Sequence, residues 1–218
     1  MNHRTYLEID LNKLEHNFNC VRNKLPDDVK ILGVIKANAY GHGAVEVGKF
    51  LDDKCDFFGV ACIEEAVELK NAEIKTPILI LGRVFPFDIE TAVKYDVRIP
   101  IFSYEDAVAL SNEAVKQGKN VPFHFCIDTG MSRIGFQVSE ESADICKSIT
   151  ELPNIFAEGL FSHFATADEK DLSKAVEQRN KYKKFCKMLS DRGVEIPIKH
   201  LNNSAGIMNF DEYFDMCR

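Results

Sequence analysis

The sequence lacks the features of several common protein classes. Its seven cysteines include no Cys-x-x-Cys pair, and their odd number and irregular spacing predict reduced thiols instead of disulfides or a zinc site. The longest apolar stretches are only strand-sized and no signal-peptide segment begins the chain, so we expect a cytoplasmic protein that does not span a membrane. No basic run is interleaved with aromatics, and the net charge of -7 argues against nucleic-acid binding.

The composition is that of an ordinary soluble globular protein, with 45% hydrophobic and 28% charged residues. A chain of 218 residues can bury a full core as one or two domains. No repeat, low-complexity segment or linker divides it, so we expect one domain over residues 1–218.

Apolar runs of strand length alternate with amphipathic helical patterns along the chain. Strands are predicted at 31–36, 57–62, 77–82, 98–102, 123–128, 156–163, 198–202 and 214–218. Continuous apolar strands joined by helices indicate parallel strands covered on the outside, either as an open doubly wound sheet or as a closed barrel. The number of strands favours an α/β fold of the (β/α)8 TIM-barrel type, and no Gly-x-Gly-x-x-Gly follows the first strand to support the open sheet.

The two ends of the chain depart from this alternation. Residues 5–25 predict a short strand followed by a helix that Asp10 caps. The last predicted strand has no helix after it. We therefore expect the N-terminal helix to take the outer position of the last helix of the barrel.

Polar side chains stand where the predicted strands end. In a (β/α)8 barrel these positions meet at one face, which carries the active site. They hold Lys36, Asp128, Thr129, Arg133, Ser162, His163, Asn202, Asn203, Ser204 and Arg218. This set is cationic although the whole chain is acidic, so it suits a small anion with a phosphate or carboxylate. Lys36 suits a partly desolvated amine that attacks a carbonyl, and a lysine that merely reaches out to solvent is the alternative.

Five segments in order carry a resemblance to bacterial alanine racemases. They are residues 34–43, 128–136, 159–168, 200–206 and 214–218. The first, Val-Ile-Lys-Ala-Asn-Ala-Tyr-Gly-His-Gly, resembles the lysine motif with which that family binds pyridoxal 5′-phosphate (PLP). The resemblance implies a (β/α)8 barrel, PLP as the cofactor, no metal, and the interconversion of L-alanine and D-alanine for bacterial peptidoglycan.

The resemblance also implies a role for each residue of the predicted site. Lys36 would hold PLP as a Schiff base and act as a base at the α-carbon of the substrate. Tyr40 and Ser204 would bind the cofactor phosphate, and Asn203 would lie beside the cofactor. The alternatives are an aromatic packed at the mouth for Tyr40 and a helix N-cap for Ser204.

Arg218 would face the pyridine nitrogen of PLP. Because an arginine only donates hydrogen bonds, the ring would stay unprotonated and would withdraw electrons weakly, which favours return of the proton over transamination. His163 would position Arg218, with a satisfied core histidine as the alternative. Arg133 would contact the substrate carboxylate or the O3′ region of the cofactor, unless it forms a structural ion pair.

Two features differ from the family pattern. Cys126 stands where many members have a carbamylated lysine that orients the substrate-binding arginine, so we hypothesise that a bound anion or another acid orients Arg133. The family's C-terminal β-domain, which supplies a tyrosine base across a homodimer, is absent from these residues. We therefore expect residues 1–218 to be the barrel domain of a longer enzyme, with little racemase activity alone, because racemisation needs a base on each face.

Three other functions compete with alanine racemase at this point. A serine racemase of the same family would carry the same motifs. A non-catalytic PLP-binding barrel would also bind the cofactor through Lys36 but would exchange no proton. A decarboxylase of the same fold would place an acid near the ring nitrogen, and Arg218 argues against it.

Overall fold

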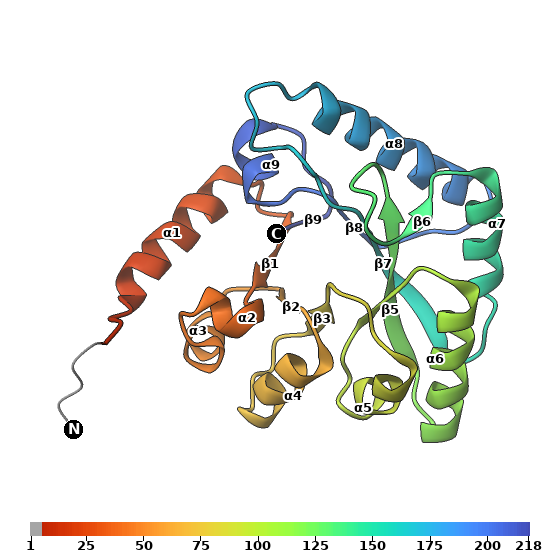
Figure 1. Ribbon diagram of the computed structural model, residues 1–218, viewed down its shortest axis with the longest axis horizontal. Coiled ribbons are helices and arrows are strands. Elements are labelled where there is room, and N and C mark those ends of the chain that lie inside the picture. The colour runs from red at the N-terminus through yellow and green to blue at the C-terminus, as the bar shows by residue number, and fades with distance from the viewer. Residues whose placement is uncertain (1–5) are drawn as a thin grey trace.

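Eight parallel strands form the wall of a nearly closed barrel in the computed structural model, which describes residues 6–218 (Figure 1). Neighbouring strands follow the order β3-β2-β1-β9-β8-β7-β5-β4. These are β1 (Lys30–Val34), β2 (Phe57–Val60), β3 (Ile78–Ile80), β4 (Ile99–Ile101), β5 (Val121–Asp128), β7 (Ile155–Phe161), β8 (Ile198–His200) and β9 (Met216–Cys217). The predicted barrel and its eight strands are confirmed.

The barrel wall is thin at two places. β9 pairs with β1 through two residue pairs and with β8 through one, His200 with Met216. On the opposite side, a single bridge between Leu79 and Arg98 joins β3 to the start of β4. By contrast, β5 and β7 pair along most of their length. A further short strand, β6 (Phe136–Gln137), pairs with β5 outside the ring and was not predicted.

The strands bury apolar side chains on both faces, because successive side chains of a strand point to opposite sides. One cluster takes a residue from each of five strands and fills the barrel interior; it consists of Leu32, Phe57, Leu79, Ile198 and Met216. The larger cluster lies between the strands and the outer helices. The barrel interior also contains two polar side chains, His124 and His200, which are both fully buried.

Helices cover the outer face of the barrel (Figure 1). They are α3 (Ala44–Leu51), α4 (Ile63–Asn71), α5 (Ile89–Lys94), α6 (Tyr104–Gln117), α7 (Glu140–Ile149) and α8 (Ser173–Ser190), with the short turns α2 (Lys36–Tyr40), η1 (Pro86–Asp88) and α9 (Ser204–Asn209). Local sequence signals set several of their ends. Ser103 accepts a hydrogen bond from the Asp106 N–H at the start of α6, and Gly118 ends that helix with φ +65°.

The N-terminal helix α1 (Leu11–Lys24) begins at Asp10, whose carboxylate accepts hydrogen bonds from two backbone N–H groups of the first turn. This confirms the predicted cap. The strand predicted before it is wrong where the structure describes it, because residues 6–10 have no regular structure. Thr5 lies outside the described residues. Five residues cannot form a stable strand without a neighbour to pair with.

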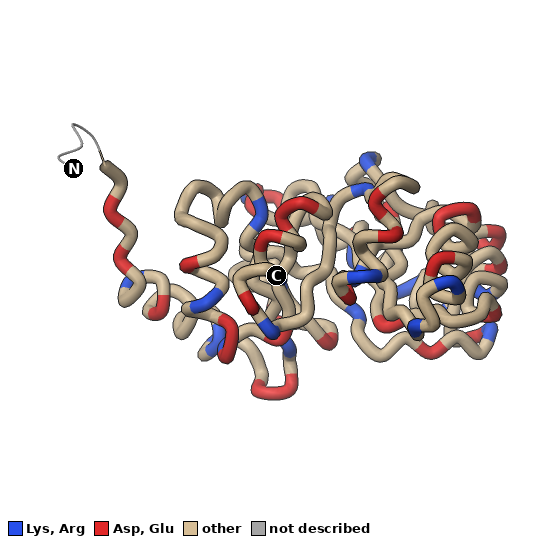
Figure 2. Tube along the Cα trace, turned by 90° about the horizontal axis from the view of Figure 1, so that it is seen from below, with Lys and Arg blue, Asp and Glu red and all other residues tan. Residues whose placement is uncertain are grey.

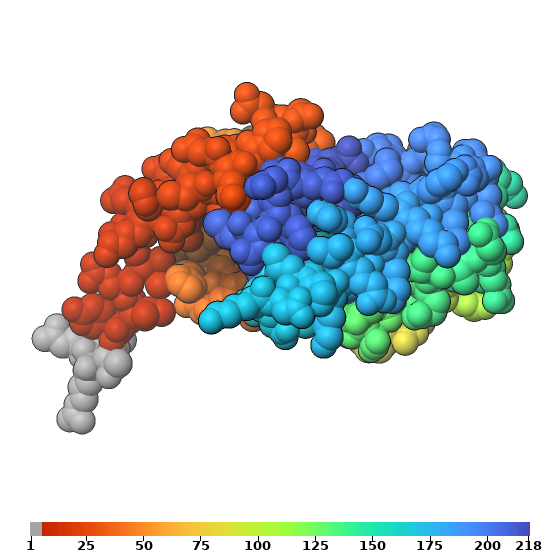
Figure 3. All heavy atoms as spheres, turned by 90° about the horizontal axis from the view of Figure 1, so that it is seen from above, coloured from red at the N-terminus to blue at the C-terminus, as the bar shows by residue number. Residues whose placement is uncertain are grey.

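The prediction that α1 takes an outer position of the barrel is confirmed. It lies beside the turn that follows α3, where Glu15 is 3.8 Å from Lys54, and its end lies near α9 (Figure 1). Its apolar residues Leu14, Phe18 and Val21 are only half-buried, and Figure 3 shows a recess between this helix and the C-terminal segment.

The surface carries charges of both signs. Acidic and basic residues are interspersed along the chain when it is seen from below (Figure 2). Within residues 6–218, every helix is too short or too polar to cross a membrane.

Candidate active site

A cavity of about 930 Å³ extends from the recess between α1 and β1 to the ends of the strands at one face of the barrel. All seven residues predicted for the site line it, namely Lys36, Tyr40, Arg133, His163, Asn203, Ser204 and Arg218. Arg83, which follows β3, lines it as well and was missed by the sequence reasoning, although its position at a strand end could have revealed it. No carboxylate belongs to the lining, so the cavity suits an anionic ligand.

Lys36 begins a left-handed turn of the backbone. The next four residues have φ between +51° and +55°, a conformation that costs about 1–2 kcal/mol for each residue with a side chain. The segment 37–40 is Ala-Asn-Ala-Tyr, and the glycines at 41 and 43 continue with positive φ. Such a turn persists only where its surroundings hold it.

Two side chains hold this turn. Glu65 in α4 accepts hydrogen bonds from the N–H groups of Ala37 and Ala61, both at 2.7 Å. Asn38 accepts a hydrogen bond from the Ala44 N–H at 2.7 Å through its side-chain oxygen. Together they attach the turn to the ends of β1 and β2 and to α3, so the backbone that carries Lys36 is fixed. Sequence reasoning missed Glu65, because an acid in the first turn of a helix is common.

Arg218 lies buried at the floor of the cavity, 9% exposed. Its Nη1 donates to Nδ1 of His200 at 2.8 Å, and its Nη2 donates to the Ser162 carbonyl at 2.7 Å and to Nδ1 of His163 at 3.2 Å. Its Nε–H has no acceptor in the part of the chain that the structure describes. Burial lowers the pKa of Arg218 to about 10, so the guanidinium stays charged at neutral pH.

His163 meets Arg218 as an acceptor, which is the contact that the sequence predicted for it. Burial and the positive charges of Arg218, Arg133 and Lys36 lower the pKa of His163 to about 4. The imidazole is therefore neutral at pH 7, and its Nδ1 is free to accept.

Arg133 is exposed at the edge of the cavity, and no carboxylate lies within ion-pair distance of it among residues 6–218. The hypothesis that another acid of the described chain orients it is therefore wrong. A small void of about 20 Å³ beside Arg133 and Cys126 has room for a water or a small ion. Burial raises the pKa of Cys126 to about 12, so the thiol is neutral and does not supply a negative charge to Arg133. That a bound anion orients Arg133 stays a prediction.

The loop after β8 presents Asn203 and Ser204 to the cavity. Asn203 is the N-cap of α9, and its side-chain oxygen accepts a hydrogen bond from the Gly206 N–H at 2.9 Å. The alternative of Ser204 as the cap is therefore wrong, and its exposed hydroxyl stands at the first position of the helix. Tyr40 is 61% exposed, which leaves its hydroxyl open as well. Asn202 is buried and bonds to backbone carbonyls, so its role is structural.

The donors around the cavity fit a ligand with a phosphate, a carboxylate and a carbonyl. Lys36 offers an amine, the arginines offer charged donors, and Tyr40 and Ser204 offer hydroxyls. Within residues 6–218, no group of three His, Cys, Asp or Glu side chains could hold a metal ion. The amine of Lys36 beside these cationic donors favours covalent amine chemistry on an anionic substrate.

Comparisons with known proteins agree with this geometry. The family model described as alanine racemase, N-terminal domain, matches residues 9–218. The alanine racemase of Clostridium tetani is 41% identical over 208 residues, which are 95% of this chain and 54% of that protein. The alanine racemase of Methanococcus maripaludis is 39% identical over 213 residues, covering 97% of this chain and 57% of that one.

The barrel also matches solved structures. An alanine racemase from Clostridium difficile superposes with a TM-score of 0.94 at 42% identity, covering 95% of this chain and 55% of that one. An alanine racemase from Bacillus anthracis with bound L-Ala-P has a TM-score of 0.88 at 34% identity, covering 96% of this chain and 55% of that one. The chain thus spans about half the length of the relatives that it matches.

Proposed function

We propose that this chain, which belongs to the alanine racemase family of PLP-dependent isomerases, is the cofactor-binding barrel of an enzyme that interconverts L-alanine and D-alanine. The observation that carries the proposal is the position of Lys36. Its amine lies on a fixed turn at a cavity that contains three arginines and no carboxylate.

PLP supplies an aldehyde that links covalently to an amine and a ring that withdraws electrons from the substrate α-carbon. The residues present fit such a group. Lys36 provides the amine, Tyr40 and Ser204 provide hydroxyls for a phosphate, and Asn203 lies beside them. Arg218 lines the floor of the cavity and would offer a charged donor to the ring nitrogen.

Arg218 sets the type of reaction in this proposal. A guanidinium whose pKa is about 10 in this site donates a hydrogen bond but does not give up its proton at neutral pH. A ring nitrogen that only accepts a hydrogen bond stabilises negative charge at the α-carbon weakly. A proton would then return to the α-carbon and not to another atom, and its delivery on the face opposite to the one it left would be racemisation.

Lys36 works on one face of the substrate, and Arg133 at the rim is placed to hold the substrate carboxylate. Racemisation also needs a proton donor on the opposite face. We propose that a part of the longer enzyme beyond this barrel, acting within a homodimer, supplies it. We therefore expect the 218-residue chain alone to bind PLP and to racemise alanine little.

The test is to incubate the chain with PLP, reduce it with borohydride and locate the added mass by peptide mapping. We expect the label on Lys36 and its loss in the Lys36→Ala variant. Lys30→Ala is the matched control, because Lys30 lies at the other end of β1 and pairs with Asp56 on the surface. Label spread over surface lysines, or label that survives Lys36→Ala, would refute the assignment.

The catalytic part of the proposal has its own measurement. Exchange of the α-proton of alanine for deuterium, followed by NMR in deuterated water, requires only the base on one face. Slow exchange that is lost in Lys36→Ala supports a racemase barrel. PLP labelling without any exchange would instead identify a non-catalytic PLP-binding barrel, and faster exchange with serine than with alanine would identify a serine racemase.

A further inference from the structure

The carboxylate of Glu65 joins the turn after Lys36 to a second strand of the barrel. One oxygen, Oε1, accepts a hydrogen bond from the Ala37 N–H at 2.7 Å, and the other, Oε2, accepts one from the Ala61 N–H at 2.7 Å. Ala37 directly follows Lys36, and Ala61 directly follows β2. Because β1 and β2 are neighbours in the barrel wall, Glu65 connects the ends of two adjacent strands through their backbone groups.

Capping of α4 does not account for both hydrogen bonds. An acid at the third position of a helix commonly accepts a hydrogen bond from the backbone just before that helix, and the bond from Ala61 is of this kind. The bond from Ala37 joins residues that are 28 positions apart and belongs to a different strand and turn. Glu65 forms no ion pair within residues 6–218. Its Oε1 atom thus serves the segment that carries Lys36.

The segment held in this way has a competing conformation. Residues 37–40 have φ between +51° and +55°, which is unfavourable for residues with side chains. Their sequence, Ala-Asn-Ala-Tyr, suits an ordinary right-handed helix, since alanine is the best helix former. A change to the right-handed form would reverse the sign of φ at Ala37 and would rotate the peptide group that joins it to Lys36. The hydrogen bond to Glu65 would then be lost, and the amine of Lys36 would move.

Glu65 acts on the cavity only through the backbone. Lys36 and Ala61 line the cavity, whereas Glu65 does not and is half-buried in the first turn of α4. A carboxylate in this place does not contact a ligand in the cavity. Its effect on the site therefore passes through the turn that it holds.

We propose that Glu65 is a positioning residue for Lys36, which selects the left-handed form of the turn and thereby holds the amine at the cavity. Asn38 attaches the same turn to the start of α3 through its hydrogen bond from the Ala44 N–H. The turn is thus held from two sides, and only Glu65 joins it to β2. The part of the amine in binding PLP rests on the proposed function, whereas the dependence of the turn on Glu65 does not.

The first test is NMR of residues 37–40 in the free 218-residue chain and in its Glu65→Gln variant. A glutamine amide has an acceptor on one side only, so its NH2 group would face the N–H of Ala37 or of Ala61. The coupling between amide and α protons, with the backbone chemical shifts, reports the sign of φ. We expect positive φ at all four residues in the unmodified chain and exchange between the two forms in Glu65→Gln. Positive φ that is unchanged in the variant would overturn the proposal.

The matched control is Glu68→Gln, because Glu68 is exposed about one turn further along α4. It removes the same charge from the same helix without touching the turn after Lys36, so residues 37–40 should keep their positive φ. A change as large as that in Glu65→Gln would mean that the turn responds to the charge of the helix and not to the two hydrogen bonds, which would also overturn the proposal.

The second test separates the position of the amine from the shape of the cavity. PLP links to Lys36 through its aldehyde, whereas pyridoxamine 5′-phosphate has the same ring and phosphate but an amine in place of the aldehyde, so it binds without this link. We expect the dissociation constant for PLP to rise about tenfold in Glu65→Gln, as for the loss of one charge-assisted hydrogen bond, and that for pyridoxamine 5′-phosphate to stay unchanged. Equal losses for both ligands would show a general distortion of the cavity and would overturn the positioning role, as would an unchanged constant for PLP.

A double variant tests whether backbone strain is what Glu65 opposes. Glycine adopts positive φ about as readily as negative φ, so Ala37→Gly makes the left-handed form easier to adopt. We expect Ala37→Gly combined with Glu65→Gln to recover part of the lost affinity for PLP, and no recovery would contradict the proposal. If the unmodified chain does not link PLP through Lys36, the proposed function fails, while the NMR measurements still decide whether Glu65 holds the turn.

Discussion

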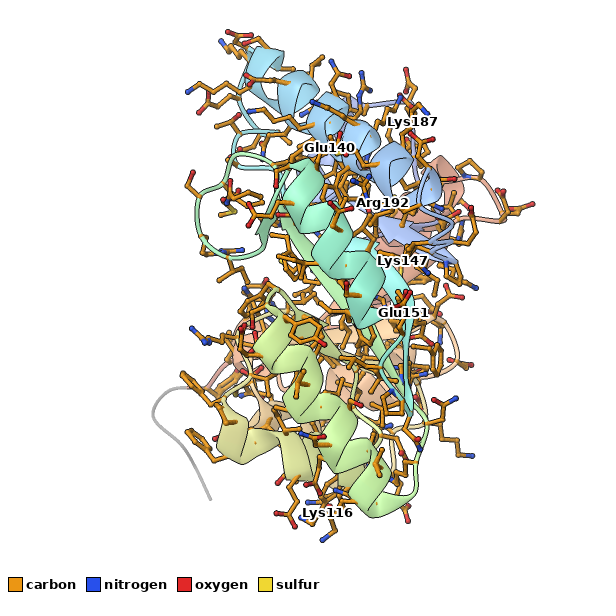
Figure 4. All side chains as sticks on the ribbon, turned by 90° about the vertical axis from the view of Figure 1, so that its right-hand side faces the viewer. Lys116, Glu140, Lys147, Glu151, Lys187 and Arg192 are labelled. Carbon is orange, nitrogen blue, oxygen red and sulfur yellow. The ribbon has the colours of Figure 1, made fainter. Side chains whose placement is uncertain are left out.

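Two arginines of this chain bind carboxylates in opposite surroundings. Arg192, after α8, holds Asp144 at 2.6 Å and Glu140 at 2.8 Å on the outer surface, where both acids are 69% exposed (Figure 4). Arg98 holds Glu158 at 3.1 Å with both side chains less than a fifth exposed, and Glu158 in turn holds the buried His124. The shorter contacts are the outer ones.

The shorter contacts are nevertheless not the more stabilising ones. Water can replace either partner of Arg192, and screening by salt weakens that attraction further. In the interior, His124 has lost its water and Arg98 and Glu158 have lost most of theirs, so removing one partner leaves a buried group without a bond. The inner ion pair of Arg98 and Glu158 accordingly contributes more to the free energy of unfolding than the outer pairs of Arg192 do. It also orients the buried ring of His124, whereas the outer pairs only join exposed side chains of the helices.

The largest effect that we expect comes from Glu158→Ala. The substitution leaves Arg98 and the Nε2–H of His124 without their acceptor inside the barrel wall. We expect the free energy of unfolding to fall by about 3 kcal/mol, measured by denaturant unfolding. A loss below about 1 kcal/mol would mean that the inner and outer ion pairs contribute equally to stability, which would contradict the comparison.

The second effect is a dependence of stability on pH that belongs to the interior alone. The pKa of His163 is about 4 in the folded chain, and burial lowers the pKa of His124 and of His200, whereas an unfolded histidine titrates near 6.5. Below pH 6.5 the unfolded chain therefore binds more protons, so stability falls as the pH falls. We expect a loss of about 1.4 kcal/mol per pH unit for each buried imidazole.

Urea unfolding at pH 7, 6 and 5 measures this slope. Arg192→Ala is the control, since it removes the outer ion pairs and no imidazole, and it should keep the slope. His124→Asn should reduce it by the share of one histidine. A stability that does not change between pH 7 and 5 would be incompatible with neutral buried imidazoles.

The third effect compares the left-handed turn with an ordinary outer helix. Ala37→Gly relieves a φ of +51° at an exposed side chain, so we expect a gain of about 0.5 kcal/mol after the higher entropy of the unfolded glycine is subtracted. Ala109→Gly in α6 has no such strain to relieve and should lose about 1 kcal/mol. Thermal unfolding of both variants gives the two signs, and equal signs would show that the turn at Lys36 is not strained.

The smallest effect belongs to the outer arginine. Arg192→Ala should lower the free energy of unfolding by less than about 1 kcal/mol, and part of that loss should disappear in 1 M salt. Equilibrium unfolding at low and high salt measures it. A loss as large as that of Glu158→Ala, unaffected by salt, would mean that the exposed pair is as important as the buried one.

The sequence predicted the barrel because its strands are buried on both faces and therefore appear as unbroken apolar runs. It missed β6, whose two residues are too few to form a pattern, and the strand that it predicted before α1 is absent from residues 6–10. The residues of the cavity were predictable, since in a barrel the strand ends converge whatever the detailed packing.

The hydrogen-bonded line from Arg218 through His200 and His124 to Glu158 was not predictable in the same way. His200 and His124 are 76 residues apart, and Glu158 is 34 residues from His124, so their contact depends on the register of three strands. Within each strand they look like single polar interruptions of an apolar run. The left-handed conformation of the backbone after Lys36 was also not predicted, because the small residues of this segment suit an ordinary helix equally well.

The thin wall at β9 gives Arg218 a mechanical importance. The barrel can be divided into two half-barrels, β9-β1-β2-β3 and β4-β5-β7-β8, joined by the narrow pairings on either side. Lys36 follows β1 in the first half, and His163 follows β7 in the second. Arg218 follows β9 directly, and its guanidinium donates hydrogen bonds to Ser162, His163 and His200 in the other half. It therefore joins the two halves by hydrogen bonds, and we expect a substitution of Arg218 to change the spacing of the halves at the mouth as well as the charge there.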